Sequence, residues 1–349
     1  MRIKDIAIFN PKGNKPEEYI NYIDTSSVED GKLHEVQTLS REIPSRAQRL
    51  IALNDILISS VRPNLRHNYF VNKEIPHGIA STGFIQIRVI SSNVNPQFLY
   101  YFLTSEQKVL HYQTIAETSQ STFPSFNKDV IEGLDFPNVT LDDQQHIVDI
   151  LGSIDEKIEN NEQEIRKIND LALCFIAKSN NLNTELKPYI KFIKGKKPIE
   201  NGSTTAPYLS IDAITSFRYE SVYSDDMIMA TPFDILMVMD GASSGTVFSH
   251  QAGVVSSTIA KIDCSDNIKD YLYWYLLSLK EIIKSRNTGS AIPHANKEYI
   301  SSLKFDYGFA TDIKTINILH SLRTRIIQLQ EENKKLQELK GLYLKKFFE

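Results

Sequence analysis

The segment STFPSFNKD (121–129) returns later in the same chain as SAIPHANKE (290–298). The two copies share Ser, Pro, Asn and Lys at equivalent positions, and both end on an acidic residue. A loop-like segment that occurs twice in 349 residues indicates internal duplication, and duplication determines the architecture of a protein.

Further similarities extend this repeat in both directions. The matched pairs are KGNKP (12–16) with KGKKP (194–198), NDILISS (54–60) with FDILMVM (233–239), GIASTGF (78–84) with GVVSSTI (253–259), FLYYFL (98–103) with YLYWYL (271–276), and ILGSI (150–154) with ILHSL (318–322). Their order is the same in both halves, and the spacing between copies shortens gradually. The pattern therefore predicts two domain-sized copies.

Each copy begins with a segment that predicts an α+β domain. The apolar runs at 55–58 and 234–237 are typical of strands, and 81–90 alternates in its second half like a half-buried strand. Pro96 opens an apolar stretch that predicts a helix, and its counterpart lies at 269–283. We therefore expect one α+β fold made twice.

Each copy ends with a segment that predicts a long helix. From 142 to about 178, and again from 313 to 348, apolar residues recur in steps of four and three, which is a coiled-coil pattern. The first seam comprises Ile147, Leu151, Ile154, Ile158, Ile165, Ile168, Ala172 and Phe175, and the second Leu319, Leu322, Ile326, Leu329, Leu336, Tyr343 and Phe347. At 1.5 Å per residue each helix would be about 50 Å long.

Polar residues interrupt both seams and predict how the helices pair. Asn161 interrupts the first seam, and Asn333 and Lys340 interrupt the second. A buried Asn is costly unless it meets a partner, so it tends to fix register. Because Asn161 and Asn333 both lie near mid-helix, we predict an antiparallel coiled coil with the two side chains at or near contact.

Composition limits the class of protein. The chain is 41% hydrophobic and 23% charged, as in ordinary globular proteins, and it has no apolar run typical of a signal peptide or a membrane span. Its two cysteines, Cys174 and Cys264, suit free thiols, so we expect a cytoplasmic protein. The net charge of −4 argues against a strong free-standing nucleic-acid binder and favours local basic patches assisted by a more basic partner.

The sequence gives little support to catalysis. Asn95-Pro96-Gln97-Phe98 is similar to the N-P-P-[YF] motif of DNA amino-methyltransferases, but Gln97 replaces a Pro and no glycine-rich cofactor loop precedes it. There is no phosphate-binding G-x-x-x-x-G-K-[ST] loop and no histidine spacing for a metal. We predict a non-catalytic chain without a metal site.

Function is therefore expected in recognition, on loops. We call SSVRPNLRH (59–67) and its counterpart DGASSGTV (240–247) the strand-end loops. The candidate DNA-binding residues are Arg62, Asn64, Arg66, His67, Ser121, Lys128, Lys194, Lys196, Lys197, Ser243, Ser244, Arg286, His294 and Lys297. Arginine and asparagine suit phosphates and base edges. Because the two strand-end loops differ, we expect two different targets.

GIASTGF, the D-I-L-I strand, the S-x-x-P-x-x-N-K loop and the heptad helix after each domain resemble the specificity subunits of type I restriction–modification enzymes. The resemblance covers essentially the whole chain. It implies two target-recognition domains (1–141 and 185–311), two spacer helices (142–184 and 312–349) and a pseudo-two-fold arrangement.

The resemblance also implies function. In this family each domain reads one half of a split double-stranded DNA site, and the helices dock two methyltransferase subunits. Those subunits bind S-adenosylmethionine and methylate adenine, and two restriction subunits join to translocate and cleave DNA. This chain would itself carry no cofactor and would not contact a membrane.

Two alternatives stay open, together with one departure from the family pattern. The chain could be a coiled-coil scaffold that joins two protein-binding domains, or a stand-alone methyltransferase, which S-adenosylmethionine binding by the isolated chain would reveal. The departure is that little precedes KDIAIF (4–9), where many relatives carry a segment that completes the helical arrangement.

Overall fold

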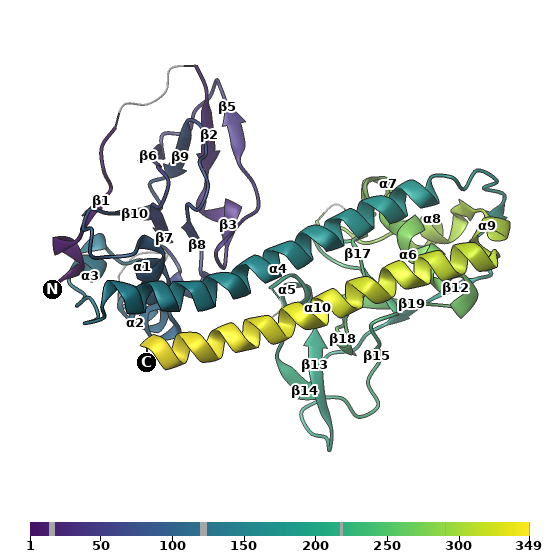
Figure 1. Ribbon diagram of the computed structural model, residues 1–349. Coiled ribbons are helices and arrows are strands. Elements are labelled where there is room, and N and C mark those ends of the chain that lie inside the picture. Colours follow the sequence, from purple (N-terminus) through teal and green to yellow (C-terminus); the bar gives the residue numbers. More distant parts are fainter. Residues whose placement is uncertain (14–17, 119–123, 217–218, 290, 349) are drawn as a thin grey trace. The chain divides into compact units, whose positions relative to one another are not determined.

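The computed structural model describes residues 1–13, 18–118, 124–216, 219–289 and 291–348 (Figure 1). The chain forms two compact units, one of Met1–Lys157 with Leu336–Glu349 and the other of Ile158–Lys335. Two long helices, α4 (Leu141–Ile176) and α10 (Ile313–Phe348), each contribute to both units. The first long helix ends before the expected limit of 184.

The first unit contains two four-stranded sheets. Its strands are β1 (Ala7–Phe9), β2 (Ile20–Ile23), β3 (Val28–Glu29), β4 (Lys32–Leu33), β5 (Gln37–Leu39), β6 (Ala47–Leu50), β7 (Ile56–Ser59), β8 (Asn68–Phe70), β9 (Gly78–Ser81) and β10 (Phe84–Val89). Its short helices are η1 (Ile3–Asp5), η2 (Thr25–Ser27), η3 (Pro63–Leu65), α1 (Pro96–Leu103), α2 (Glu106–Glu117) and α3 (Lys128–Glu132). The sheet orders are β1-β10-β7-β8 and β5-β2-β9-β6, and β3 pairs with β4.

The second unit contains the same kind of sheets. Its strands are β11 (Thr184–Glu185), β12 (Ile190–Lys194), β13 (Thr205–Leu209), β14 (Ser221–Tyr223), β15 (Met229–Ala230), β16 (Ile235–Val238), β17 (Val247–Phe248), β18 (Gly253–Val255), β19 (Ile259–Cys264) and β20 (Lys304–Phe305). Its short helices are α5 (Ile211–Ser216), α6 (Asp266–Ser278), α7 (Lys280–Ser285), α8 (Lys297–Ser302) and α9 (Tyr307–Thr311). The sheet orders are β12-β19-β16-β17 and β14-β13-β18-β15, and β11 pairs with β20.

The strand order and strand directions show that the two units have one fold. The first four-stranded sheet of each unit has the same strand order. β1, β10, β7 and β8 of the first unit take the places of β12, β19, β16 and β17 in the second. Each second sheet also contains one parallel pair at the same place, β2 with β9 and β13 with β18, among antiparallel neighbours. The duplication predicted from the sequence is therefore confirmed.

The central strand of each unit is buried on both faces, which explains its continuous apolar run. In β7, Ile56 and Ile58 pack in the core that includes α1, whereas Leu57 packs in a separate core with Phe84. β16 is divided in the same way, with Ile235 and Met237 in one core and Leu236 and Val238 in another.

A charged residue precedes each of these strands and is buried with a partner. Asp55 is fully buried and pairs with Arg88 of β10, with 2.7 Å between Oδ2 and Nη2. Asp234 accepts from Lys261 of β19 at 2.8 Å. Each aspartate also accepts a backbone N–H three residues upstream, so the buried charge is well compensated. The Asp-Ile-Leu repeat thus encodes an internal strand anchor.

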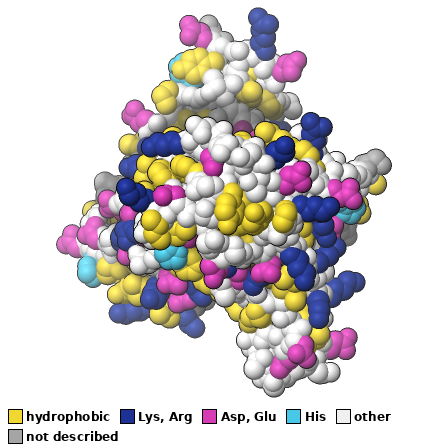
Figure 2. Space-filling model, turned by 90° about the vertical axis from the view of Figure 1, so that its right-hand side faces the viewer, with side chains coloured by type: hydrophobic (Ala, Val, Ile, Leu, Met, Phe, Trp, Pro, Cys, Tyr) yellow, Lys and Arg dark blue, Asp and Glu magenta, His cyan; other side chains and the backbone are white. Residues whose placement is uncertain are grey.

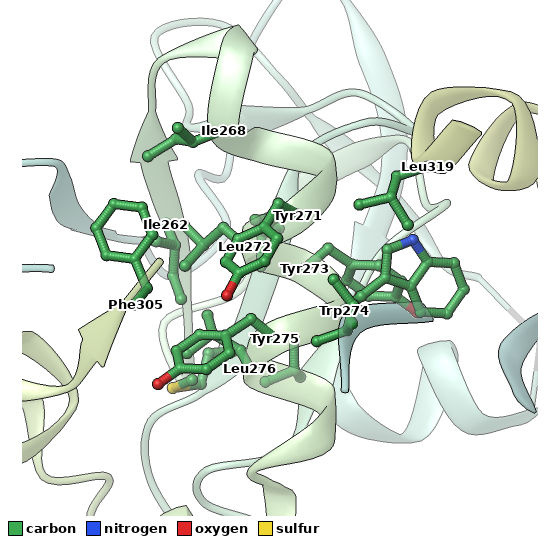
Figure 3. Close-up of a cluster of buried hydrophobic side chains, with 14 of the residues drawn as sticks. Ile262, Ile268, Tyr271, Leu272, Tyr273, Trp274, Tyr275, Leu276, Phe305 and Leu319 are labelled. Atoms are coloured by element: carbon green, nitrogen blue, oxygen red, sulfur yellow. The ribbon is translucent and has the colours of Figure 1, made fainter. Parts of the chain in front are cut away.

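The core of the second unit is built around α6, which carries apolar and aromatic side chains on more than one face (Figure 3). Trp274 is fully buried and lies on the side of α6 that faces Leu319 of α10. Ile262 of β19 and Phe305 of β20 lie toward the opposite side of the helix. The helix therefore joins the sheet to the long helix in one continuous core.

Within each unit, the segments of α4 and α10 run antiparallel (Figure 1). In the second unit, Asn161 donates to Oδ1 of Asn333 at 2.8 Å, and Glu164, farther along α4, pairs with the earlier Arg325 of α10. The predicted asparagine contact is present. In the first unit, Lys340 donates to Asp155 at 2.6 Å, which satisfies the third seam interruption.

A buried arginine connects α10 to the α+β domain of the second unit. Arg323 is fully buried, and its guanidinium donates to Asp270 of α6 and to the carbonyl oxygen of Phe233, each at 2.8 Å. It also donates to Ser249 and lies 4.9 Å from the ring centroid of Tyr273. Burial acts to lower the pKa of Arg323, and Asp270 opposes this shift.

Replacing Arg323 by Ala should lower the free energy of unfolding by about 3–5 kcal/mol, because it leaves Asp270 buried without its main partner. Urea or thermal unfolding of the full chain measures this effect. Arg325→Ala is the matched control, since the ion pair of Arg325 with Glu164 is about half exposed and its loss should change stability little. Equal losses in the two variants would contradict the role of Arg323 as an anchor.

Candidate nucleic-acid interface

The duplicated S-x-x-P-x-x-N-K motif pairs with the end of the central strand in both units. In the first, the Arg62 N–H donates to the carbonyl oxygen of Pro124 at 2.9 Å, and in the second the Gly241 N–H donates to Pro293 at 2.9 Å. The motif segment also donates a backbone N–H to the carbonyl oxygen of the residue that follows the strand. The donor and acceptor are Phe126 and Ser60 in the first unit, and Ala295 and Met239 in the second. The repeated motif therefore holds each strand-end loop in place. We call the segment that carries the motif the bracing loop.

The Asn of the motif begins a short helix, but the two copies do so differently. Asn296 accepts the Tyr299 N–H with its side chain at 2.9 Å, which caps α8. Asn127 precedes α3 without a capping hydrogen bond from its side chain. The next residue, Lys128, forms ion pairs with Glu132 and Asp129. Lys128 is therefore partly neutralised within its own domain.

Two arginines of the first strand-end loop occupy left-handed backbone conformations. Arg62 has φ of 49° and Arg66 has φ of 53°, a region that costs a residue with a side chain about 1–2 kcal/mol. The position equivalent to Arg62 is Gly241, whose φ of 103° carries no such cost. Arg62 is exposed, and its role in binding DNA stays a prediction.

The other candidates of this loop differ in availability. The Arg66 side chain is 16% exposed and pairs with Glu106, so it serves mainly inside the domain. Asn64 is exposed, and its backbone N–H donates to Gln113 at 3.2 Å. Burial lowers the pKa of His67, with Glu29 and Asp24 acting in the opposite direction, and the imidazole is therefore neutral near pH 7.

In the second unit, the predicted residues Lys194 and His294 both contact the carboxylate of Asp240, which was not predicted from the sequence. Asp240 accepts from Lys194 Nζ at 2.8 Å and lies 2.8 Å from Nδ1 of His294. Lys194 ends β12, Asp240 follows β16, and His294 belongs to the bracing loop. An aspartate before a glycine is typical of an ordinary turn and does not by itself indicate a binding role. The sequence signal that could have identified Asp240 was its alignment with the apolar Val61 of the first copy.

The two serines proposed for the second strand-end loop are not equivalent. Ser244 is fully buried and accepts from the Asn287 side chain at 2.7 Å, so it is structural and cannot reach DNA. Ser243 is partly exposed. The prediction for Ser244 was wrong because a loop sequence gives no measure of how deeply each hydroxyl lies.

The remaining basic candidates lie on exposed segments of the second unit. Lys196 and Lys197 are both exposed, and Lys196 donates to the carbonyl oxygen of Asp226 at 3.3 Å. Arg286 lies over the ring of Tyr299 and Lys297 over that of Phe192. Ser121 lies outside the described residues. In Figure 2, basic side chains lie among acidic ones on the visible face.

Gly195 explains why the motif KGKKP contains a glycine. A Cβ at this position would come within 2.2 Å of the carbonyl oxygen of Val255, so only glycine allows the close backbone approach. This close packing of Gly195 against Val255 of β18 fixes the positions of its two neighbours, Lys194 and Lys196.

The methyltransferase-like segment has a structural role. Asn95 caps α1 by accepting the N–H groups of Gln97 and Phe98, and Phe98 is fully buried. A buried ring cannot stack on an extruded base. Within the described residues, no group of three or more His, Cys, Asp or Glu side chains could hold a metal ion, and no helix is long and apolar enough to cross a membrane.

Comparison with known proteins explains the duplicated architecture. The family model described as "Type I restriction modification DNA specificity domain" matches residues 1–170 and again residues 184–341. The chain belongs to this family. The two matches fall on the two copies that the repeated motifs and the sheet order define.

Two curated specificity subunits are each similar to part of this chain. The type I restriction enzyme HindI specificity subunit of Haemophilus influenzae is 31% identical over 43% of this chain and 33% of its own length. The MjaVIII specificity subunit of Methanocaldococcus jannaschii is 33% identical over 46% of this chain and 40% of its own. The matched regions thus span well under two thirds of these relatives.

A solved structure supports the fold. The S subunit of a type I restriction–modification system from M. genitalium is similar with a TM-score of 0.54 at 17% identity, and the match covers 100% of this chain and 95% of that one. At this identity the similarity bears on the fold alone.

Asn296→Ala should lower the free energy of unfolding by about 1 kcal/mol, because it removes the side-chain cap of α8. Asn127→Ala is the matched control and should change stability much less, since that side chain makes no capping bond. Chemical denaturation of the two variants measures the difference. A larger loss for Asn127→Ala would show that the brace is built differently from the hydrogen bonds described above.

Proposed function

We propose that this chain is the DNA-recognition subunit of a type I restriction–modification complex. Each domain would read one half of a bipartite site in double-stranded DNA. One observation carries the proposal: the two domains share a braced strand-end loop but present different side chains there. These are Arg62 in the first domain, and Asp240 with His294 of the bracing loop in the second. Equal frameworks with unequal loops suit two unequal half-sites.

The chemistry would belong to partner subunits. Two methyltransferase subunits would bind S-adenosylmethionine and methylate adenine, two restriction subunits would translocate and cleave DNA, and this chain would be non-catalytic. The net charge of −4 fits this division, because a chain with so little net attraction for DNA benefits from basic partners. Its own contribution would come from exposed cations such as Arg62, Lys196 and Lys197.

The long helices would dock the methyltransferase subunits. Besides the apolar seam that pairs them, they carry exposed apolar side chains that a partner subunit would cover. Leu171 and Ile318 are 58% and 41% exposed in the second unit, and Leu339 and Leu342 are 41% and 67% exposed in the first. These residues support partner docking on the helices.

The proposed function is tested by co-expressing the chain with candidate methyltransferase subunits and mapping methylated adenines across the host genome. The expected result is methylation at a split, asymmetric motif that disappears when the chain is omitted. Methylation that ignores the chain, or a complex that assembles and never binds DNA, would contradict the proposal and favour a scaffold.

Arg62→Gly separates stability from recognition. It replaces a left-handed arginine by the residue that the second copy uses there, so it should raise stability by about 1 kcal/mol while weakening recognition of one half-site. Arg66→Gly is the matched control: its φ is similar, but its side chain is only 16% exposed, whereas that of Arg62 is exposed, so recognition should persist. Thermal unfolding and methylation mapping give the two measurements. Unchanged recognition in Arg62→Gly would remove Arg62 from the interface.

A further inference from the structure

Two segments distant in the sequence converge on Asp240 in the second domain. Lys194 reaches it from the end of β12, and His294 reaches it from the bracing loop, each at 2.8 Å. The side chains of Lys194 and His294 are 50% and 51% exposed, and that of Asp240 is 27% exposed. The cluster is therefore ordered by its own contacts and still open to solvent.

The backbone of His294 is held on both sides. Its N–H donates to the Thr288 carbonyl oxygen at 2.7 Å, and the Thr288 N–H donates back at 2.9 Å. On the other side, the neighbouring Pro293 and Ala295 bond to Gly241 and Met239. A ring held in this way loses little further conformational entropy when it binds a partner, which favours precise recognition.

The first domain has the same backbone bonds with different side chains. Val61 and Ser125 stand where the second domain has Asp240 and His294, and both pairs form an isolated antiparallel bridge. Residues that stabilise a shared fold are expected to agree between copies, as Asp55 and Asp234 do. Side chains that change from apolar and hydroxyl to carboxylate and imidazole on an unchanged framework are therefore candidates for specificity.

The chemistry of the cluster suits a base edge. Burial acts to raise the pKa of Asp240, but hydrogen bonds from Lys194 and His294 outweigh it and hold the pKa below its ordinary value. The carboxylate is therefore ionised and only accepts hydrogen bonds. Nδ1 of His294 lies 2.8 Å from this carboxylate, so a proton on Nδ1 donates to Asp240 and orients the ring. An accepting carboxylate fits the one N–H that base pairing leaves free on an exocyclic amino group in the major groove, as on cytosine.

We propose that Asp240 and His294 form a base-reading pair of the second domain, which recognises an exocyclic amino group at one base pair of its half-site. This inference rests on the proposed function. Lys194 offsets the negative charge of Asp240, so that a carboxylate can approach a polyanion, and it also attracts the phosphate backbone. Asp240 has a second role as the positioning residue for His294.

The test uses the full chain in complex with its methyltransferase subunits and a pool of randomised duplex DNA. Asp240→Asn should reduce the preference at one base pair of one half-site by about tenfold. His294→Ala should affect the same base pair. The altered half should be the one that Arg62→Gly leaves intact. Lys194→Ala should weaken binding to all sequences alike without changing the preferred base.

Asp263→Asn is the matched control, since it removes the same charge from an exposed position elsewhere on the same sheet. It should leave base preference unchanged. Wild-type preference in both Asp240→Asn and His294→Ala, or an equal change in Asp263→Asn, would overturn the proposal. Failure of the unaltered complex to select any two-part motif would instead contradict the proposed function. If Asp240→Asn unfolds, the half-exposed His294 still decides the outcome through His294→Ala.

Discussion

The hydrogen bond between Asn161 and Asn333 is the constraint on which the helix pair depends. Both amides are almost fully buried in a mainly apolar seam, so each loses its partner if one helix shifts along the other. A shift of one heptad moves the amides about 10 Å apart, and leaving a polar group buried without a partner costs about 1–3 kcal/mol. The pairing therefore fixes which segments of α4 and α10 lie together in the second unit.

Duplication explains how one fold can serve two targets. Residues that build the framework agree between the copies: the buried aspartate before the central strand, the bracing proline, and the sheet order with its single parallel pair. The side chains on the strand-end loops do not agree. Stability and specificity are thus carried by different residues, so the loops can change without loss of the fold.

Features that depend on a local pattern or on the repeat could be predicted from the sequence. The heptad steps predicted the long helices, the mid-helix asparagines predicted their contact, and the motif order predicted two equal domains. The roles of Asp240 and the buried Arg323 could not be predicted. Their partners lie far away in the sequence, and no local pattern indicates these contacts. Ser244 failed for a related reason, since its burial depends on Asn287.

Cross-linking tests the helix pairing most directly. In a chain whose Cys174 and Cys264 are replaced by Ser, cysteines at positions 161 and 333 should be joined within one chain by a short bis-maleimide. Cysteines at 161 and 319 should not be joined, because fourteen helical residues separate 319 from 333, about 21 Å. Efficient joining of 161 with 333 alone is the predicted result. No joining of that pair, or equal joining of both pairs, would contradict the antiparallel register.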